Sequence, residues 1–390
     1  GLYRLGVRKN DIVACQLPNW WQFTITYLAC SRIGAVMNPL MHIFRERELS
    51  FMLKHGEAKV VIVPKVFRGF DFEAMATGLR ASLPDLQHIV VVGGEGESSF
   101  EKLLSGPAWE SEADAASILQ SNRSGPDDVT QLIYTSGTTG EPKGVMHTAN
   151  TVMANIFPYA QRLRLAADDV VLMASPMAHQ TGFMYGLMMP ILLRQSVVLL
   201  DVWEPLKAID LIRDESVSFT MASTPFLTDL AKNVESSGKT VPTLKIFLCA
   251  GAPIPGPLVE QARRVLGTKI VSAWGMTENG AVTLILPDDQ DERAVNTDGC
   301  PLPGVEIKVI DTDGSQAPAG QPGKLMVRSC SNFGGYLRRP HLNGTDAEGW
   351  FDTGDLARVD ERGYVRITGR SKDVIIRGGE NIPVVEIESL

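Results

Sequence analysis

Residues 134–144, YTSGTTGEPKG, carry the side chains whose types and spacing point most clearly to chemistry. The run follows the apolar sequence QLI and contains four serine or threonine hydroxyls and three glycines. Glycine lets a backbone approach a ligand closely, hydroxyl and backbone N–H groups donate to phosphate oxygens, and Lys143 adds a positive charge. The run therefore predicts an anion-binding loop at the end of a strand, although its composition is also typical of a solvated turn.

Three other binding signatures are incomplete. The sequence GGEGES follows a predicted strand, but Ser99 stands where a dinucleotide fingerprint has its last glycine. A Walker loop has serine or threonine after its lysine, whereas Gly144 follows Lys143. The six histidines include no HExxH pair, which disfavours a catalytic zinc site.

Composition and charge restrict the class of protein. The chain has 390 residues, 44% of them hydrophobic and 21% charged, as in a globular protein of two or more domains. Its formal net charge of -8 argues against nucleic acid as a partner. No apolar stretch reaches the roughly 18 to 20 residues of a membrane-spanning helix. The five cysteines form no CxxC pair, which predicts reduced thiols in a cytoplasmic chain.

Short β-branched runs alternate with helix-length amphipathic segments before Gly299, as is typical of α/β folds with buried strands. These predicted strands cover residues 59–64, 88–94, 170–175, 196–201 and 245–251. After Gly299, turns rich in glycine and proline separate alternating strands, which predicts a small antiparallel, barrel-like unit. Its strands cover residues 305–311, 323–329 and 363–369.

Four ordered motifs connect the chain to a known family. They are YTSGTTGEPKG at 134–144, WGMTE at 274–278, WFDTGD at 350–355 and GRSKDVIIRGGENI at 369–382. Over nearly its whole length the chain resembles the adenylate-forming superfamily of acyl-CoA synthetases, amino-acid adenylation domains and luciferases. Residues 38–53 and 178–190 look most like bacterial fatty-acid or cyclohexanecarboxylate–CoA ligases.

The resemblance implies an α/β fold with two doubly wound subdomains and a small antiparallel, barrel-like subdomain. We expect the first α/β subdomain at residues 1–125 and the second, with the phosphate loop, at 126–299. The barrel-like subdomain is expected at 300–369, and the hinge and the start of a mobile domain at 370–390.

Enzymes of this family join a carboxylate to the α-phosphate of ATP, release pyrophosphate, and pass the acyl group from AMP to a thiol. Because the first step brings two anions together, it needs a metal and hydrogen-bond donors that neutralise charge. The resemblance assigns Thr277 to the α-phosphate and Glu278 to Mg²⁺, a hard cation that takes carboxylate oxygen. It assigns the β- and γ-phosphates to Thr135, Ser136, Gly137, Thr138, Thr139 and Lys143, with Thr139 counted as catalytic.

The resemblance places the nucleoside between two further motifs. Asp355 is expected to accept hydrogen bonds from both ribose hydroxyls, which one carboxylate can do, and Arg370 is expected to be a second ribose or phosphate contact. The adenine is expected in a slot formed by Gly251, Ala252, Pro253 and Trp274.

The acyl group is expected beside His179, whose imidazole could donate to the substrate carboxylate. No aspartate occurs between Ser175 and Leu187, where amino-acid adenylation domains place one, so an α-amino acid substrate is disfavoured. An apolar pocket for an uncharged acyl group would be formed by Phe183, Met184, Tyr185, Ala273, Gly275 and Met276. Equally, the Phe and Met side chains could be core residues.

Family members carry a further domain with a lysine that binds the reacting groups, and the resemblance implies that this chain contains only its beginning. Lys372 matches the hinge position of the family and not that catalytic lysine. The chain is also expected to lack part of the first subdomain. By itself it is therefore expected to bind ATP and acid but to adenylate poorly.

The sequence thus predicts a cytoplasmic carboxylate–CoA ligase that uses ATP, Mg²⁺ and CoA and acts on a medium-chain or alicyclic carboxylic acid. A homodimer is one possible assembly. Two alternatives remain open at this point: an adenylate-forming enzyme that loads a carrier protein, and a non-catalytic homologue that binds acyl-AMP or nucleotide.

Overall fold

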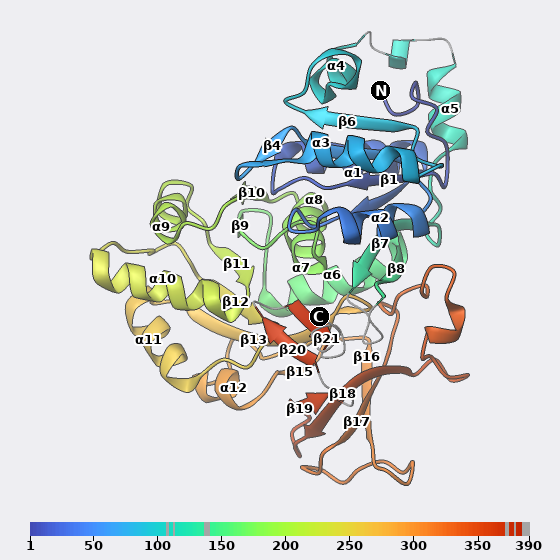
Figure 1. Ribbon diagram of the computed structural model, residues 1–390. Coiled ribbons are helices and arrows are strands. Elements are labelled where there is room, and N and C mark those ends of the chain that lie inside the picture. The colour runs from blue at the N-terminus through green and yellow to red at the C-terminus, as the bar shows by residue number, and fades with distance from the viewer. Residues whose placement is uncertain (107–108, 112–113, 136–140, 371–373, 378–379, 384–390) are drawn as a thin grey trace.

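The computed structural model describes residues 1–106, 109–111, 114–135, 141–370, 374–377 and 380–383. Three large sheets follow one another through the ribbon, from the N-terminal unit at the top of Figure 1 to the antiparallel unit at the bottom. Two short hairpins accompany them, β4 (Val66–Phe67) with β5 (Phe70–Asp71), and β20 (Val374–Arg377) with β21 (Glu380–Pro383).

The first sheet has the strand order β6-β3-β1-β2-β7-β8, and only the β7–β8 pair is antiparallel. Its buried β-branched runs explain why these segments form interior strands. The strands are β1 (Ile12–Cys15), β2 (Val36–Pro39), β3 (Ala58–Pro64), β6 (His88–Val92), β7 (Val129–Thr135) and β8 (Lys143–Thr148).

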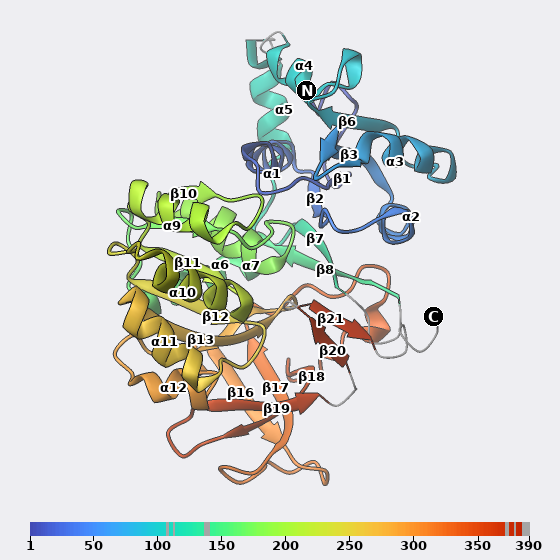
Figure 2. The ribbon, with the colours of Figure 1, turned by 60° about the vertical axis from the view of Figure 1, so that its left-hand side comes forward.

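Helices cover both faces of the first sheet. Helix α1 (Trp21–Ile33) packs on one face, and α2 (Glu46–His55) and α3 (Phe72–Leu79) pack on the other, as Figure 2 shows. Shorter helices complete this unit: η1 (Arg80–Ser82), η2 (Gly96–Ser98), α4 (Phe100–Ser105), η3 (Trp109–Ser111) and α5 (Ala115–Ser121).

The second sheet has the order β10-β9-β11-β12-β13-β14-β15, and it is parallel up to β13. The strands are β9 (Val170–Met173), β10 (Ser196–Leu199), β11 (Phe219–Ala222), β12 (Ile246–Ala250), β13 (Lys269–Met276), β14 (Gly280–Leu284) and β15 (Cys300–Pro301). The helices are α6 (Ala149–Leu163), α7 (Gln180–Gly182), the π-helical turn η4 (Phe183–Met188), α8 (Met189–Leu193), α9 (Pro205–Asp214), α10 (Thr224–Ser237), α11 (Gly256–Leu266) and α12 (Asp291–Asn296).

The two α/β units share one hydrophobic core. Buried residues of both sheets, such as Val13 and Val171, belong to a single cluster that also includes helices α1 and α6 and turn η4. Tyr27 of α1 meets Phe183 of η4 edge to face, with ring centroids 5.1 Å apart. Because this cluster joins both sheets, the units form one packed body.

The third sheet is antiparallel with the order β16-β17-β18-β19. Its strands are β16 (Val305–Ile310), β17 (Gly323–Ser329), β18 (Phe351–Val359) and β19 (Val365–Arg370), and the short helix η5 (Pro340–Leu342) lies in the long connection between β17 and β18. The small antiparallel unit is confirmed, but its four strands form an open sheet and not a closed barrel.

The connection before β18 also crosses to the first sheet. Met146 on β8 donates its N–H to the carbonyl of Gly335 at 3.1 Å and accepts from the N–H of Gly334 at 2.8 Å. Leu337 donates to the carbonyl of Gly144 at 2.8 Å. The third unit is therefore attached directly to the strand that follows the predicted phosphate loop.

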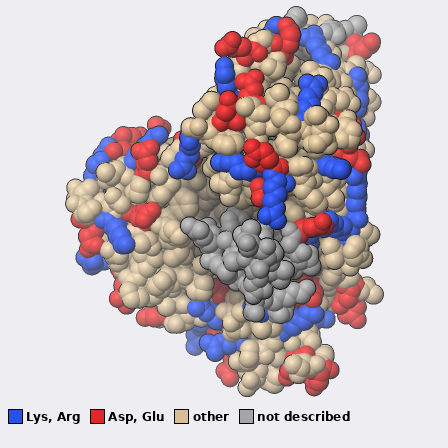
Figure 3. Space-filling model, in the orientation of Figure 1, with Lys and Arg blue, Asp and Glu red and all other residues tan. Residues whose placement is uncertain are grey.

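The α/β class is confirmed, and each predicted strand lies on an observed one. The predicted boundary between residues 125 and 126 does not coincide with sheet membership, since β7 and β8 follow it but belong to the first sheet. All five cysteines lie in the described ranges and have free thiols. Among the described helices, none has both the length and the apolar character needed to cross a bilayer. Figure 3 shows charges of both signs interspersed on one face of the molecule.

Candidate active site

The predicted phosphate loop connects β7 with β8. Thr135 is the last residue of β7 and Lys143 the first of β8, while Ser136, Gly137, Thr138 and Thr139 lie outside the described residues. The Oγ1 atom of Thr135 is buried and has no hydrogen-bond partner among the described residues. A buried hydroxyl without a partner is costly, so this atom is a candidate ligand contact.

Lys143 and Glu278 meet through a tyrosine that the sequence reasoning did not select. The Lys143 ammonium donates to Tyr336 Oη at 2.9 Å and lies 4.3 Å from the ring centroid. Tyr336 Oη donates to Glu278 Oε1 at 2.6 Å. Burial, and then the charge of Glu278, raise the pKa of Tyr336, so the phenol stays neutral. Two predicted ligand residues are therefore held by one hydroxyl group.

Thr277 is held by a buried histidine of β8. Its carbonyl accepts from His147 Nε2 at 2.7 Å, and His147 Nδ1 lies 3.0 Å from Thr151 Oγ1 at the start of α6. Because a carbonyl can only accept, Nε2 carries the proton. Burial lowers the pKa of His147 to about 4, so the ring is neutral near pH 7.

Side chains of α6 and η4 hold the turn after Glu278 through hydrogen bonds. Asn155 of α6 donates to the carbonyls of Asn279 at 3.1 Å and Ala281 at 2.7 Å. Tyr185 of η4 donates to Asn155 Oδ1 at 2.6 Å and accepts from the N–H of Ala281 at 2.9 Å. These contacts make the backbone around Glu278 rigid. Tyr185 is among the residues predicted for the acyl pocket, and nothing in its sequence motif indicates this contact with the turn.

Asp355 on β18 lies in the second part of the site. It is 1% exposed, accepts from Trp274 Nε1 at 3.0 Å through Oδ2, and has Arg370 Nε 2.7 Å from Oδ1. The antiparallel register pairs Asp355 with Arg370 across β18 and β19. Burial raises the pKa of Asp355, Arg370 and Trp274 lower it, and the charge of Glu278 raises it further. The two carboxylates therefore belong to one electrostatic site.

The predicted adenine slot is formed by the ends of two neighbouring strands. Ala250 of β12 pairs with Ala273 of β13, so Gly251 leaves its strand beside Trp274. Gly251 has φ +90°, a conformation that favours glycine, and Gly251 and Pro253 are exposed. Strand ends in such sheets are common ligand sites, and the turn at residues 251–253 follows the strand that neighbours the one with Trp274.

The residues predicted for the acyl pocket fall into two groups. Phe183 and Met184 are fully buried in the shared core, as is usual for core residues. Met276 is half-buried and Gly275 is exposed at the end of β13. His179 precedes α7, where its Nδ1 accepts from the N–H of Thr181 at 3.2 Å. Their role in binding an acyl group stays a prediction, as does the hinge role of Lys372, which lies outside the described residues.

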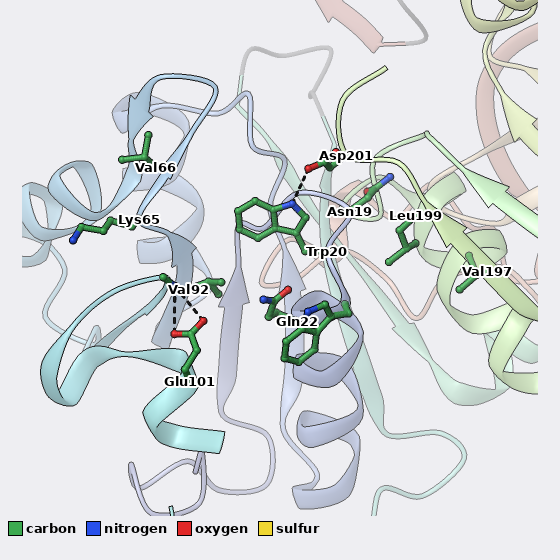
Figure 4. A pocket seen from close by; sticks show the side chains of 12 residues that line it. Asn19, Trp20, Gln22, Lys65, Val66, Val92, Glu101, Val197, Leu199 and Asp201 are labelled. Atoms are coloured by element: carbon green, nitrogen blue, oxygen red, sulfur yellow. Dashed lines mark hydrogen bonds between the residues drawn. The ribbon is translucent and has the colours of Figure 1, made fainter. Parts of the chain in front are cut away.

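The surface also has a hollow away from these residues. It has a volume of about 900 Å³ and lies where α1 begins, between the first sheet and β10, as Figure 4 shows. Trp20 donates to Asp201 at 2.9 Å on one side, and Glu101 accepts from the N–H of Gly93 at 3.2 Å on another. None of the predicted site residues that the structure describes lines this hollow.

The residues present fit a magnesium ion bound together with a polyphosphate. Within the described ranges, no group of three His, Cys, Asp or Glu residues could form a metal site alone. The hydrogen bond from Tyr336 engages only Oε1 of the Glu278 carboxylate among the described contacts. Mg²⁺ is commonly held by one or two carboxylates plus substrate phosphates and waters, and Glu278 suits that arrangement.

Comparisons with known proteins found a matching family model and several similar proteins. Residues 1–337 match the family model described as AMP-binding enzyme. The medium-chain fatty-acid–CoA ligase of Escherichia coli is 37% identical over 387 residues, which are 99% of this chain and 68% of that protein. The ATP-bound MatB structure from Rhodopseudomonas palustris has a TM-score of 0.79 and 27% identity over 100% of this chain and 74% of its own. The inhibitor-bound N-terminal domain of FACL13 from Mycobacterium tuberculosis has a TM-score of 0.83 and 26% identity, and the match covers 95% of this chain and 88% of that one.

Proposed function

The chain belongs to the family of AMP-binding enzymes, and on this premise we propose that it activates a medium-chain or alicyclic carboxylic acid as an acyl-adenylate and transfers it to CoA. Membership makes it an enzyme of the ATP-dependent acyl-CoA ligase family. The identity of the acid and the transfer to CoA are the proposed part. Support comes from the medium-chain fatty-acid–CoA ligase that is 37% identical over 99% of this chain.

The structural observation that carries the proposal is the convergence of Glu278, Lys143 and Asp355. They come from strands or turns of three different sheets: Tyr336 links Lys143 to Glu278, and Trp274, four residues before Glu278, donates to Asp355. A polyphosphate needs cations at one end of the site, and a ribose needs a carboxylate acceptor at the other. The arrangement supports a nucleoside triphosphate that extends between them.

In the first step, a carboxylate oxygen of the acid attacks the α-phosphorus of ATP, the bond to the β-phosphate breaks, and pyrophosphate leaves. Glu278 would hold Mg²⁺, which when bound neutralises charge on the phosphates. Lys143 supplies a fixed positive charge, and the Thr277 hydroxyl is a neutral donor for the α-phosphate. His147 and Asn155 keep the backbone around Thr277 and Glu278 in place before the nucleotide arrives.

In the second step, the thiolate sulfur of CoA attacks the acyl carbonyl, a thioester forms, and AMP leaves with the bonding electron pair. Asp355 and Trp274 would keep the AMP portion in place during this exchange. The segment between Ser175 and Leu187 contains no Asp, Glu, Lys or Arg, and Gly275 and Met276 carry no charge, which supports an uncharged acyl group.

A panel of carboxylic acids tests the proposal. Pyrophosphate release with the full chain should be fastest with a medium-chain or alicyclic acid, and the acyl product should appear on free CoA. Thr139→Ala, a change in the phosphate loop, should slow release with every acid by about 100-fold if its hydroxyl stabilises the transition state. Transfer to a holo-carrier protein but not to CoA would instead identify a carrier-loading enzyme. Absence of ATP-dependent pyrophosphate release with all acids would refute the proposal.

A further inference from the structure

Tyr336 joins three separate parts of the chain at one oxygen atom. Its hydroxyl lies 2.9 Å from the Lys143 ammonium, at the start of β8, and 2.6 Å from the Glu278 carboxylate, in the turn after β13. Tyr336 itself lies in the connection before β18 and is 4% exposed. A group that bridges two predicted ligand residues in a buried place influences both of them.

The position of Tyr336 is fixed independently of these two contacts. Its N–H donates to Asn343 Oδ1 at 2.9 Å, and its ring packs edge to face against Phe333 with centroids 4.7 Å apart. The ring belongs to a buried cluster with Ile133, Val145 and Phe351. The hydroxyl is thus placed by packing and does not depend on Lys143 or Glu278 for its orientation.

The phenol separates two opposite charges that would otherwise be free to approach one another. An ammonium and a carboxylate within reach of one oxygen in a buried site would form a strong direct ion pair. Such a pair would satisfy both groups and make each less available to a ligand. The neutral phenol instead accepts from Lys143 and donates to Glu278, so it gives each group one hydrogen bond.

We propose that Tyr336 is a positioning residue that keeps Lys143 and Glu278 apart and presents them separately, Glu278 to Mg²⁺ and Lys143 to the phosphates of ATP. This inference rests on the proposed function, because it requires Mg²⁺ and ATP as ligands. In this proposal the phenol acts through the two charged side chains.

The test measures ATP affinity by titration calorimetry, with excess Mg²⁺ and with EDTA, in the absence of acid. The ratio of the two affinities reports the contribution of the metal. In Tyr336→Phe this ratio should fall about tenfold, the size expected when a hydrogen bond to a charged group is lost. A merely structural role would lower both affinities equally and leave the ratio unchanged.

Tyr364→Phe is a matched control. Tyr364 is also buried, donates to the Asp289 carboxylate at 2.7 Å, and has Arg293 4.2 Å from its ring centroid, but it does not contact the site residues. Its ratio should equal that of the wild type. An unchanged ratio in Tyr336→Phe would overturn the inference. If the wild type itself fails to bind ATP with Mg²⁺, the proposed function fails and this inference falls with it.

Lys143→Met is a second variant that leaves the aromatic cluster intact. It should weaken ATP binding in EDTA but keep the ratio within about twofold of the wild type, because Tyr336 still holds Glu278. In the double variant, Lys143→Met should restore part of the affinity ratio that Tyr336→Phe loses, since no ammonium remains to pair with Glu278. A large fall in the ratio for Lys143→Met alone would show that Glu278 depends on the lysine, and would overturn the inference.

Discussion

The two ends of the site use the same kinds of groups in different arrangements. At the phosphate end, the Glu278 carboxylate meets an aromatic hydroxyl, and the cation Lys143 lies behind it. At the ribose end, the Asp355 carboxylate meets an aromatic N–H from Trp274 and a cation, Arg370, directly. A phenol therefore separates the charges at one end, whereas the charges are in contact at the other.

This difference matches what each end would bind. A carboxylate that receives a metal needs an oxygen that no cation occupies, and the Tyr336 contact leaves Glu278 in that state among the described contacts. A carboxylate that receives hydroxyl groups can exchange one donor for another at small cost, so direct contact with Arg370 is compatible with ribose binding. The position of the cation, and not its presence, therefore distinguishes the two ends.

The largest expected effect comes from removing the Glu278 carboxylate, which we propose to hold Mg²⁺. Glu278→Ala should reduce pyrophosphate release about 100- to 1,000-fold, because a group that stabilises the transition-state charge is lost. The control is Glu260→Ala on the exposed side of α11. A variant that keeps more than a tenth of the wild-type rate would contradict the assignment of Glu278 to this end.

The second-largest expected effect is a loss of folding stability in acid that comes from His147 at the phosphate end. The pKa of His147 is lowered from 6.5 to about 4, so the unfolded chain binds the proton more readily, and stability is lost as pH falls through this window. The loss can reach about 3 kcal/mol. His147→Gln should flatten the profile in urea unfolding between pH 7 and pH 4, whereas His341→Gln, at an exposed position, should not.

Asp355 contributes in the opposite direction. Burial raises its pKa above 3.8, so the folded chain holds the proton more readily, and this contribution to stability is lost as pH rises through the raised pKa. If His147→Gln and Asp355→Asn changed the pH dependence of the free energy of unfolding by the same amount and in the same direction, the two ends would not differ.

The smallest effect tests the ribose end. Asp355→Asn keeps an acceptor for Trp274 but loses the charge and one oxygen, so ATP should bind about tenfold more weakly. Binding of 2′,3′-dideoxy-ATP, which lacks both hydroxyls, should not change. Asp352→Asn is the control, since Asp352 lies on the same strand and pairs with Lys324 at 2.7 Å. A similar loss for both nucleotides would show that Asp355 does not read the ribose.

The sequence predicted the strands and the separate motifs because their signals are local. Strand β17 covers the predicted residues 323–329, and β13 contains the first three residues of the WGMTE motif. The open third sheet was not predicted, because alternation along a strand does not show whether the last strand pairs with the first.

The connections between motifs could not be predicted. Tyr336 follows two glycines in a loop, and nothing in that local pattern shows that its hydroxyl reaches residues 58 and 193 positions away. His147 lies in a short strand, where a histidine is more often structural. The one feature of the sequence that could have indicated its role is its position four residues after Lys143. Phe183 and Met184 show the reverse problem, since an apolar stripe has the same composition in a core and in a pocket.

Gly275 limits how this molecule can be redesigned for other acids. A Cβ atom at this position would lie 2.0 Å from the carbonyl oxygen of Gly280 and 2.8 Å from the Cα of Ala281, so the backbone of β14 leaves no room for a side chain. Saturation mutagenesis at Gly275 should therefore return few folded clones. Libraries that aim to change the acyl preference have more freedom at Met276, which already carries a half-buried side chain, although that side chain packs against the cluster of Val145 and Tyr336.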